Sequence, residues 1–491
     1  METREGKMIN HRLFFSFILL SLTFCSALFA QELEVLADQA WQFSAEQLDA
    51  TIDEIRNNAS RHPKITNSVQ ADGNGRWITS KRHGWTSGFF SGCLWLMYER
   101  TGNQAWLEKA EKWTADLESQ KYNTGDHDVG FRMFCSYGNG VRINPNEKYK
   151  KVLLKSANSL SQRYNARIGC IKSWDWTGNF AVIIDNMMNL ELLLWASKNG
   201  GENELADMAV NHADKTIENH VREDGSTYHV VDYNDDGSVN LKRTHQGYSD
   251  ESTWSRGQSW GLYGYTMMYR ETGEQRFLDT ALLMADYVIE NLPEDYVPYS
   301  DFDAPNIPDC EKDASAAAIA CSALLELGQY SDNPVYLTTA ENMLRSLIEN
   351  YLAKGTDYSS ILHRASQFWG DAERGTSYAD YYFLEALSRY EKYESTVLAH
   401  NKKPLNFHLP PAFPNPFNAC TTIEFECDHA CLLKLEIFDA TGRHVETLLD
   451  EHRTAGSHQI RWHANDYPSG VYLVRLSSGM EMLKQKILLV K

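Results

Sequence analysis

Two aspartates occupy equivalent places in the chain, because each stands where a helix is expected to begin. Asp185 follows three apolar residues and precedes the leucine-rich stretch 190–194, and Asp128 comes directly after His127. An aspartate at such a position is commonly only an N-cap. If the two carboxylates converge, burial and mutual repulsion raise the pKa of one of them, as a general acid at neutral pH requires. A helix N-terminus favours the anion, so burial must dominate at Asp185 for this chemistry.

Side chains that bind sugars stand near the same expected helix starts. Tryptophan rings offer flat apolar faces for stacking, and histidine side chains hydrogen-bond hydroxyl groups. The candidate binding residues of this kind are Trp85, His127, Trp174, His229 and Trp254. Taken alone, a histidine such as His229 is more often structural than a ligand-binding residue.

Arg256 stands at another expected helix start, where the guanidinium and the backbone N–H groups both attract anions. It therefore suits the carboxylate of a ligand. The local pattern equally allows an ion pair with one of the many acidic residues of the chain. Asp313 and Asp380 occupy the same kind of position, but we expect them only to cap helices.

A repeat ties these positions together. Five times a helix-like segment ends at a glycine-containing turn and a second helix follows, and the chemically suited residues precede the first helix of each pair. The turn glycines are Gly102, Gly140, Gly200, Gly273 and Gly328. Segments 34–57 and 381–393 supply the helices of a sixth pair.

Six antiparallel helix pairs that close on each other form an (α/α)6 barrel, which brings the candidate residues to one rim. A linear helical solenoid is the alternative, but a solenoid requires repeats of regular length. Here the repeat length varies widely, and the extra length lies in loops before the first helix of a pair. We therefore expect the barrel.

The composition excludes one class of partner. The 491 residues carry 47 Lys and Arg against 66 Asp and Glu, which gives a net charge of −19. Phosphate binding needs a basic face, so we expect no nucleic acid partner. If the ligand is an anion, its attraction must come from local positive groups.

The N-terminus has the layout of a secretory signal peptide over residues 1–30. Arg4, Lys7 and Arg12 precede an apolar run that ends at Ala30, a suitable cleavage point. A retained membrane anchor is the alternative, since the run is near the short limit of a spanning helix. No other long apolar run follows, so we expect no stable membrane span once the signal is removed.

The chain changes character at a proline-rich joint. Residues 31–398 carry mostly helical apolar spacing and should form the barrel domain. Residues 399–412 are expected to be a linker, because Pro404, Pro410 and Pro411 end helices. Over 413–491 the apolar period becomes two in short segments divided by turns, which predicts a small all-β, immunoglobulin-like sandwich.

The tail carries short motifs in a fixed order. They are Phe413-Pro-Asn-Pro-Phe-Asn418, Ile437-Phe-Asp439, Thr441-Gly-Arg443, Trp462 and Ser469-Gly-Val-Tyr472. With these motifs the tail resembles the C-terminal sorting domain of the type IX secretion system. The resemblance implies that machinery as a partner, export through the periplasm and across the outer membrane, and a secreted or cell-surface location. An ordinary accessory or carbohydrate-binding sandwich is the alternative.

The helical part also contains an ordered set of motifs. They are His127-Asp-Val-Gly-Phe131, Ile183-Ile-Asp-Asn-Met-Met-Asn-Leu-Glu-Leu-Leu193, His245-Gln-Gly-Tyr248, Trp254-Ser-Arg-Gly-Gln-Ser-Trp-Gly-Leu-Tyr-Gly264 and Tyr378-Ala-Asp-Tyr-Tyr-Phe-Leu-Glu-Ala-Leu387. Over roughly residues 41–393 the chain resembles the unsaturated glucuronyl hydrolases, glycoside hydrolase family 88. The resemblance implies an (α/α)6 barrel with no metal or organic cofactor.

The same resemblance implies a substrate and a reaction. The substrates are oligosaccharides left by polysaccharide lyases, with a C4=C5 double bond in the non-reducing-end uronate, and the reaction hydrates this vinyl ether. Asp185 matches the acid that protonates C4 and helps water add at C5, and Asp128 matches a second essential carboxylate that holds the ring. The positions that match substrate-binding residues are Trp85, His127, Trp174, His229, Gln246, Trp254 and Arg256.

One segment departs from the family pattern. Residues 365–376 lack a basic pattern associated with binding a sulfated second sugar, which argues against a preference for sulfated chondroitin or heparin fragments. Two other functions stay open. One is an unsaturated rhamnogalacturonyl hydrolase, with the same barrel and chemistry on pectin fragments. The other is a non-catalytic surface glycan-binding protein, against which the presence of both Asp128 and Asp185 speaks.

Overall fold

The computed structural model describes residues 32–68, 73–371, 373–401, 407–427, 431–440, 442–478 and 481–491. The predicted signal peptide, residues 1–30, lies outside the described residues. The chain divides into two compact units, residues 1–393 and 394–491. Within the described ranges, no helix combines the length and the apolar character needed to cross a bilayer.

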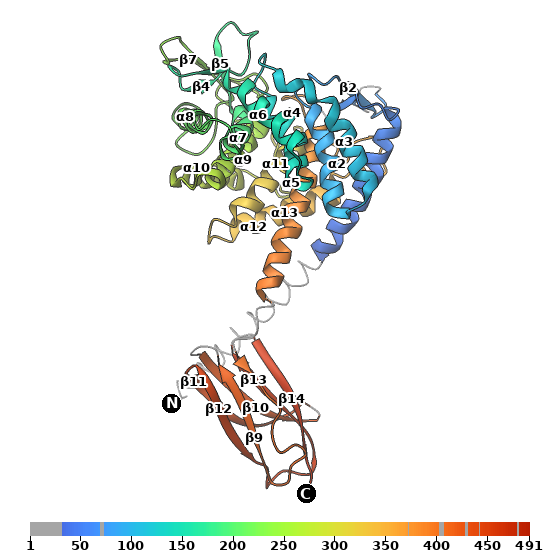
Figure 1. The fold of residues 1–491 in the computed structure, drawn as a ribbon, viewed down its shortest axis with the longest axis vertical. Helices are drawn as coiled ribbons and strands as arrows, with labels where there is room; N and C mark the ends of the chain where they lie inside the picture. Colours follow the sequence, from blue (N-terminus) through green and yellow to red (C-terminus); the bar gives the residue numbers. More distant parts are fainter. Residues whose placement is uncertain are drawn as a thin grey trace. The chain divides into compact units, whose positions relative to one another are not determined.

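The first unit is helical (Figure 1). Its inner helices, which are largely buried, are α2 (Ser87–Thr101), the broken segment α4 (Val129–Met133), η2 (Phe134–Gly138) and α5 (Asn139–Ile143), the segment η3 (Ile184–Asn189) with α7 (Leu190–Lys198), α9 (Ser255–Thr272), α11 (Ala314–Leu327) and α13 (Ser377–Asn401). Its outer helices are residues 32–54, α3 (Gln104–Asp116), α6 (Glu147–Ser161), α8 (Glu204–Asn219), α10 (Gln275–Glu290) and α12 (Val335–Asn350), and the short η1 (Glu118–Tyr122) follows α3.

The composition of the helices explains the two layers. In α11 every residue is buried, and its run of alanines allows neighbouring helices to approach on all sides. In α10 the buried residues recur with helical spacing along one face, as in Phe277, Ala281 and Met284. A helix of the first kind must lie inside, and a helix of the second kind can face solvent.

The ring closes where the first and last helices of the unit meet α2. Arg100, near the end of α2, pairs with Asp38 of the helix 32–54 at 2.7 Å and with Glu391 of α13 at 2.8 Å. Segments almost three hundred residues apart are therefore neighbours. The prediction of an (α/α)6 barrel is confirmed.

The turn glycines fall where expected, with one exception. Gly102, Gly200 and Gly273 have φ of 64°, 100° and 71°, a left-handed conformation that glycine adopts without strain. The assignment of Gly140 to a turn was wrong, because it lies inside α5. A Cβ atom there would come within 2.8 Å of the ring of Tyr149, so this glycine permits close packing between helices.

Small antiparallel sheets lie in the loops that precede inner helices. They are β1 (His62–Thr66) with β2 (Trp77–Ser80), β3 (Tyr164–Asn165) with β4 (Cys170–Ile171), and β5 (Phe180–Ile183), β6 (Val230–Tyr233) and β7 (Val239–Arg243) in that order. Figure 1 shows β4, β5 and β7 together at one end of the helical unit. In the largest sheet Ile183 pairs with Val230, so the start of η3 lies beside the start of β6.

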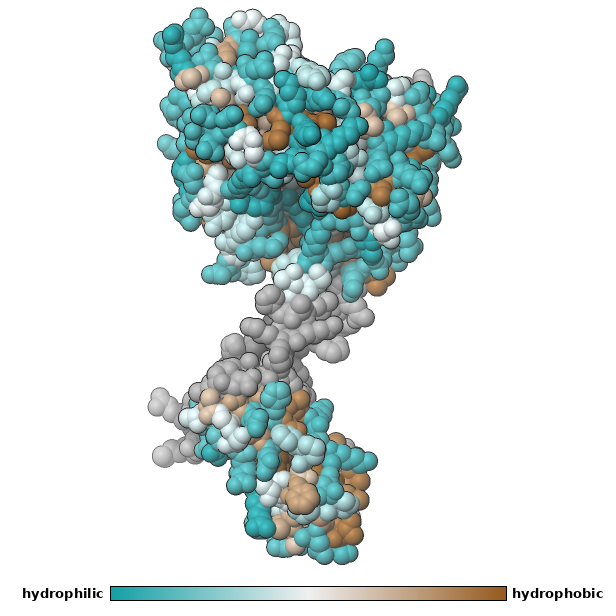
Figure 2. Space-filling model, in the orientation of Figure 1, coloured by the Kyte–Doolittle hydropathy of each residue, from teal (hydrophilic) through white to brown (hydrophobic). Residues whose placement is uncertain are grey.

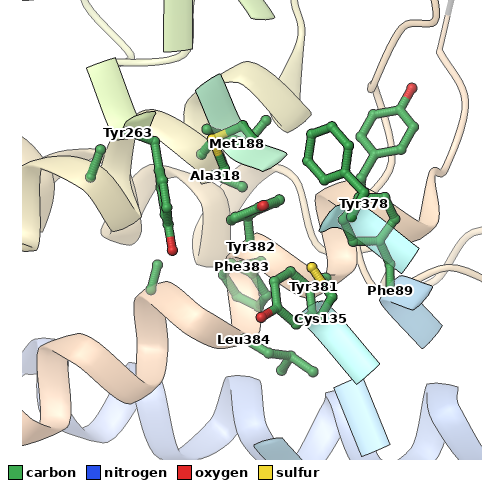
Figure 3. Packing of buried hydrophobic residues seen from close by; sticks show 14 of the residues in the cluster. Phe89, Cys135, Met188, Tyr263, Ala318, Tyr378, Tyr381, Tyr382, Phe383 and Leu384 are labelled. Carbon is green, nitrogen blue, oxygen red and sulfur yellow. The ribbon is translucent and has the colours of Figure 1, made fainter. Parts of the chain in front are cut away.

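Aromatic side chains fill the centre of the barrel around α13. Figure 3 shows Phe89, Tyr378, Tyr381 and Tyr382 close together in this core. The ring centroids of Phe89 lie 5.7 Å from Tyr381 and 6.1 Å from Tyr378. Tilted and edge-to-face contacts of this kind fix the inner helices at their N-terminal ends.

The second unit is a pair of antiparallel sheets around one apolar core. Its strands are β8 (Phe407–His408), β9 (Cys420–Cys427), β10 (Cys431–Asp439), β11 (His444–Arg453), β12 (Gly456–His463), β13 (Gly470–Ser478) and β14 (Glu481–Leu489). The orders are β11-β10-β13-β14 and β12-β9-β8, and Trp462 is buried between the sheets. The predicted C-terminal sandwich is confirmed. The short strand β8 lies within the segment 399–412 and pairs with β9.

The visible surface of the helical unit is mostly hydrophilic. Figure 2 shows hydrophobic residues on it only in small patches. The whole 491-residue chain has a net charge of −19, which favours a well-hydrated surface.

Candidate active site

A cleft of about 280 Å³ lies at the N-terminal ends of the inner helices and contains both candidate aspartates. Its lining residues are Trp85, His127, Asp128, Trp174, Trp176, Ile183, Asp185, His245, Gln246, Arg256, Gln367, Phe368 and Tyr378. A larger cavity of about 510 Å³ lies among α4, α7, α9 and α13 and contains neither aspartate. The chemistry therefore points to the smaller cleft.

Asp185 lies in η3, directly after β5, and is only 7% exposed. Its side chain does not cap the helix, so the N-cap alternative fails here. Burial raises the pKa of this carboxyl group to about 7, against a smaller opposing effect of Arg256, and the charge of Asp128 raises it further. At neutral pH Asp185 can therefore both donate and accept a proton.

Asp128 precedes α4, and its side chain makes no capping hydrogen bond there. Its Oδ1 lies 3.4 Å from His127 Nε2, and its own backbone N–H donates to Asp126 Oδ1 at 2.9 Å. Burial raises the pKa of Asp128 above the ordinary aspartate value. The two carboxylates thus line one cleft, and burial raises the pKa of each.

A contact between α4 and η3 fixes the positions of the two aspartates relative to each other. Asn189 at the end of η3 accepts a hydrogen bond from the backbone N–H of Phe131 in α4, at 2.9 Å. Gly130 allows this approach, since a Cβ atom there would lie 2.5 Å from Asn189 Cα. The spacing of the carboxylates therefore depends on a residue without a side chain.

We expect Gly130→Ala to destabilise the fold by about 1–3 kcal/mol and to lower activity, because the added methyl group forces α4 away from η3. Thermal unfolding and kcat/KM measure the two effects. The matched control is Gly125→Ala in the preceding loop, where the nearest atom to a new Cβ is Asn123 Oδ1 at 3.4 Å. Equal melting temperatures of the two variants would show that the approach of α4 to η3 is not constrained.

Two predicted binding residues lie behind the cleft instead of in its wall. Trp254 and His229 are each 2% exposed, and their ring centroids are 4.5 Å apart. Neither contributes to the lining of the cleft. Gln246 does line it, and its side-chain amide donates to the carbonyl oxygen of Gln367 at 2.6 Å.

Arg256 lines the cleft but is already paired. Its Nη1 lies 2.9 Å from Asp313 Oδ2, and both side chains are buried. The guanidinium also donates to the carbonyl oxygens of Ser366 and Gln367. The ion pair that the sequence left open is therefore present. Arg256 presents a guanidinium edge to the cleft with much of its charge balanced.

The two aspartates expected to be caps behave differently. Asp313 does cap α11, since its Oδ1 accepts from Ser315 N at 2.9 Å. Asp380 does not cap its own helix, and that prediction was wrong. Its Oδ1 accepts the backbone N–H groups of Ile361 and Leu362, at 3.1 and 2.9 Å, and so holds the preceding loop against α13.

Two pairs of aromatic rings line the cleft. Trp85 stacks on Tyr378 with centroids 5.1 Å apart, and Trp174 stacks on Trp176 at the same distance. Trp176 is 67% exposed and Phe368 is 49% exposed, so both offer open faces at the mouth. Within the described residues, no three His, Cys, Asp or Glu side chains converge as metal ligands would.

Several lining residues were not predicted as site residues. They are His245, Gln367, Phe368 and Tyr378. His245 and Tyr378 stand within motifs quoted above. No local signal marks Gln367 or Phe368, because their place depends on how the loop before α13 folds back to Gln246.

Comparison with known proteins covers both units. Residues 411–491 match the secretion system C-terminal sorting domain. Residues 57–399 match the model of glycosyl hydrolase family 88. These matches agree with the two resemblances inferred from the motifs.

Individual relatives match at useful levels of identity. An unsaturated glucuronyl hydrolase of Formosa agariphila is 46% identical over 317 residues, which cover 62% of this chain and 79% of the relative. An unsaturated chondroitin disaccharide hydrolase of Streptococcus pyogenes is 33% identical over 326 residues, or 63% of this chain and 81% of the relative. The crystal structure of an unsaturated glucuronyl hydrolase specific for heparin superposes with a TM-score of 0.70 at 37% identity, over 74% of this chain and 98% of that one. With the family model matching well over half of its length, the chain belongs to glycosyl hydrolase family 88.

Proposed function

We propose that the chain is an unsaturated glucuronyl hydrolase. It releases the 4,5-unsaturated uronic acid from the non-reducing end of oligosaccharides left by polysaccharide lyases. The observation that carries the proposal is the buried carboxyl group of Asp185, which lies in the wall of a cleft flanked by aromatic rings. Burial raises the pKa of this group to about 7. Such a group can protonate carbon at neutral pH and then act as a base.

The proposed reaction needs one acid and one water molecule. Protonated Asp185 gives its proton to C4, and the ring oxygen shares the positive charge that develops at C5. Water adds to C5 as the Asp185 carboxylate takes up a proton from it, which restores the acid. The resulting hemiketal opens to a ketone at C5, and the hemiacetal left at C1 releases the neighbouring sugar. This differs from ordinary glycosidases, which place two carboxylates around the glycosidic bond.

The other cleft residues then have binding roles. Asp128 holds the sugar ring and raises the pKa of Asp185 through its charge. Trp85 and Trp174 pack against sugar faces, and His127 and Gln246 hydrogen-bond hydroxyl groups. Arg256 faces the uronate carboxylate, while Trp254 and His229 act from behind the wall.

The second sugar of the substrate should be unsulfated. The relatives differ in what their names state, from glucuronyl groups to chondroitin disaccharide and heparin. In this chain the segment 365–376 contributes Gln367 and Phe368 to the cleft, an amide and a phenyl ring. Arg256 is the one Lys or Arg among the described lining residues, and it is paired with Asp313. We therefore favour unsulfated glycosaminoglycan-type fragments.

The test is a panel of unsaturated disaccharides from hyaluronan, chondroitin, heparin and pectin. Cleavage removes the ultraviolet absorbance of the conjugated double bond, and saturated disaccharides serve as the control. Rapid loss with unsulfated glycosaminoglycan fragments supports the proposal. Loss only with the pectin fragment would assign a rhamnogalacturonyl hydrolase, and no loss with any unsaturated uronide would leave a glycan-binding protein.

The pH dependence of kcat should have an alkaline limb near pH 7. Asp185 must be protonated for the first step, and burial raises its folded-state pKa from 3.8 to about 7. The rate is therefore retained below that pH and falls about tenfold per unit above it. Initial rates with saturating substrate measure the limb, over a range where the circular dichroism spectrum is unchanged. A rate that keeps rising through pH 8 would contradict Asp185 as the acid.

We also propose a route of export. Residues 1–30 direct the chain into the periplasm, and the tail 413–491 directs it across the outer membrane by the type IX machinery. Residues 31–398 then form the catalytic domain, and 399–412 joins the two. The match of residues 411–491 to a sorting domain supports this route. Deletion of 413–491 should leave an active enzyme that stays inside the outer membrane.

A further inference from the structure

We propose that His229 is a positioning residue for Asp185: a fixed hydrogen-bond donor to one carboxylate oxygen, and not a ligand of the sugar. The inference rests on the proposed function, since it concerns the acid of that reaction. It assigns a different role from the substrate contact that the family resemblance implies for this histidine.

Burial separates His229 from any substrate. The residue is 2% exposed and does not line the cleft. The ring of Trp254 packs against it with centroids 4.5 Å apart. Asp185, by contrast, lines the cleft and faces His229 Nε2. Any effect of His229 on a bound sugar must therefore pass through another residue.

The surrounding backbone fixes the tautomer of His229. Its Nδ1 lies 3.2 Å from the backbone nitrogen of His245 and 3.3 Å from that of Gln246. Both backbone groups are donors, so Nδ1 must be the acceptor and the proton must sit on Nε2. Burial lowers the pKa of His229 well below its usual value, which keeps the ring neutral.

The protonated nitrogen faces the catalytic carboxyl group. His229 Nε2 lies 3.6 Å from Asp185 Oδ2, and both atoms are buried without another hydrogen-bond partner among the described residues. Unsatisfied buried polar atoms are costly and rare. The strand pairing holds the two residues in place, since Ile184 N donates to His229 O at 3.0 Å. A closure of a few tenths of an ångström gives a normal hydrogen bond.

This contact decides which oxygen carries the acidic proton. A donor that faces the buried Oδ2 leaves Oδ1 as the site of protonation, on a residue that lines the cleft. After C4 has received the proton, the same N–H stabilises the carboxylate that remains. His127 is arranged in the same way toward Asp128, with Nδ1 near Asn189 Nδ2 at 3.5 Å and Nε2 at 3.4 Å from Oδ1.

The test compares two substitutions at position 229. His229→Asn places an amide oxygen where Nδ1 accepts the loop N–H groups but removes the donor to Asp185. His229→Gln extends an amide N–H toward the place of Nε2. The titratable and charged groups that also face this pair are Arg256, Asp128, His245, His220 and Arg243, and they are the same in both variants.

We expect His229→Asn to lower kcat about 10- to 100-fold with KM changed by less than about threefold. The alkaline limb of kcat should move up by about one pH unit, because the carboxylate loses a donor and its pKa rises. His229→Gln should restore much of both values. The measurements are kcat, KM and the pH profile with an unsaturated disaccharide that the wild-type protein cleaves.

Three outcomes overturn the inference. A rise in KM with kcat and the alkaline limb unchanged would make His229 a substrate ligand. Equal losses in both variants with lowered melting temperatures would make it a purely structural residue. An Asn variant with wild-type kcat and pH profile would remove any role in positioning. Failure of the proposed function is a separate result, since the wild-type protein would then cleave none of the unsaturated disaccharides.

Discussion

Replacement of Asp185 by Asn is expected to lower kcat by about a thousandfold or more while substrate still binds. The amide has the shape of the carboxyl group but cannot give a proton to C4 or take one from water. Both halves of the proposed reaction therefore fail together. The measurement is the loss of double-bond absorbance with an unsaturated disaccharide, together with binding of the same substrate by calorimetry.

The same substitution should stabilise the fold at neutral and alkaline pH. The pKa of Asp185 is raised from 3.8 to about 7 on folding, so the folded state binds the proton more tightly. Stability contributed by this group is present at low pH and is lost as pH rises through about 7. Removing the charge recovers up to about 4 kcal/mol, since each pKa unit is worth about 1.36 kcal/mol.

A matched control separates these effects from a general loss of charge. Asp235→Asn makes the same change in the exposed turn between β6 and β7 and should alter neither activity nor stability. Wild-type activity in Asp185→Asn would contradict the assignment of the acid. An inactive Asp185→Asn variant with a lower melting temperature than the wild-type protein at pH 8 would contradict the proposed cost of burying the Asp185 charge.

Replacement of Asp128 by Asn is expected to lower kcat/KM by about a hundredfold or more, through both binding and catalysis. The amide loses the charged hydrogen bonds to the sugar, so KM rises. The charge of Asp128 also raises the pKa of Asp185, so its removal should move the alkaline limb of kcat to lower pH. Steady-state kinetics over pH measure the two effects.

The direction of the pH shift distinguishes the two aspartates. Loss of Asp128 moves the alkaline limb of kcat to lower pH. Loss of Asp185 removes the activity on which this limb is measured. Asp235→Asn again serves as the control for a change of charge alone. An unchanged limb in Asp128→Asn, with only KM raised, would limit Asp128 to binding the ring.

The helical fold could be predicted because its signals are local. Apolar spacing marks each helix, and left-handed glycines such as Gly102 and Gly273 end them. The prediction of a turn at Gly140 was wrong because this glycine serves a tertiary contact: the ring of Tyr149 packs against it. The strands of the tail were found from their period of two, whereas the two-residue strand β8 is too short to carry one.

The candidate site was predictable to the extent that helix starts mark it. Asp128 and Asp185 both reach the cleft, as their positions indicated. Trp254 does not, because the N-cap residue of α9 packs against His229 behind the cleft wall. The partner of Arg256 stands 57 residues away at Asp313, and no local pattern reveals such a pair.

Deuterium transfer from solvent to C4 tests the central claim most directly. The reaction is run in deuterated water with the wild-type protein, and nuclear magnetic resonance follows the uronate product and the released sugar together. Because Asp185 delivers the proton from one side of the ring, we predict one deuterium at C4 with a single configuration, appearing no later than the released sugar. Release of the sugar while the C4=C5 double bond is still intact would contradict hydration of the vinyl ether and, with it, the role of Asp185.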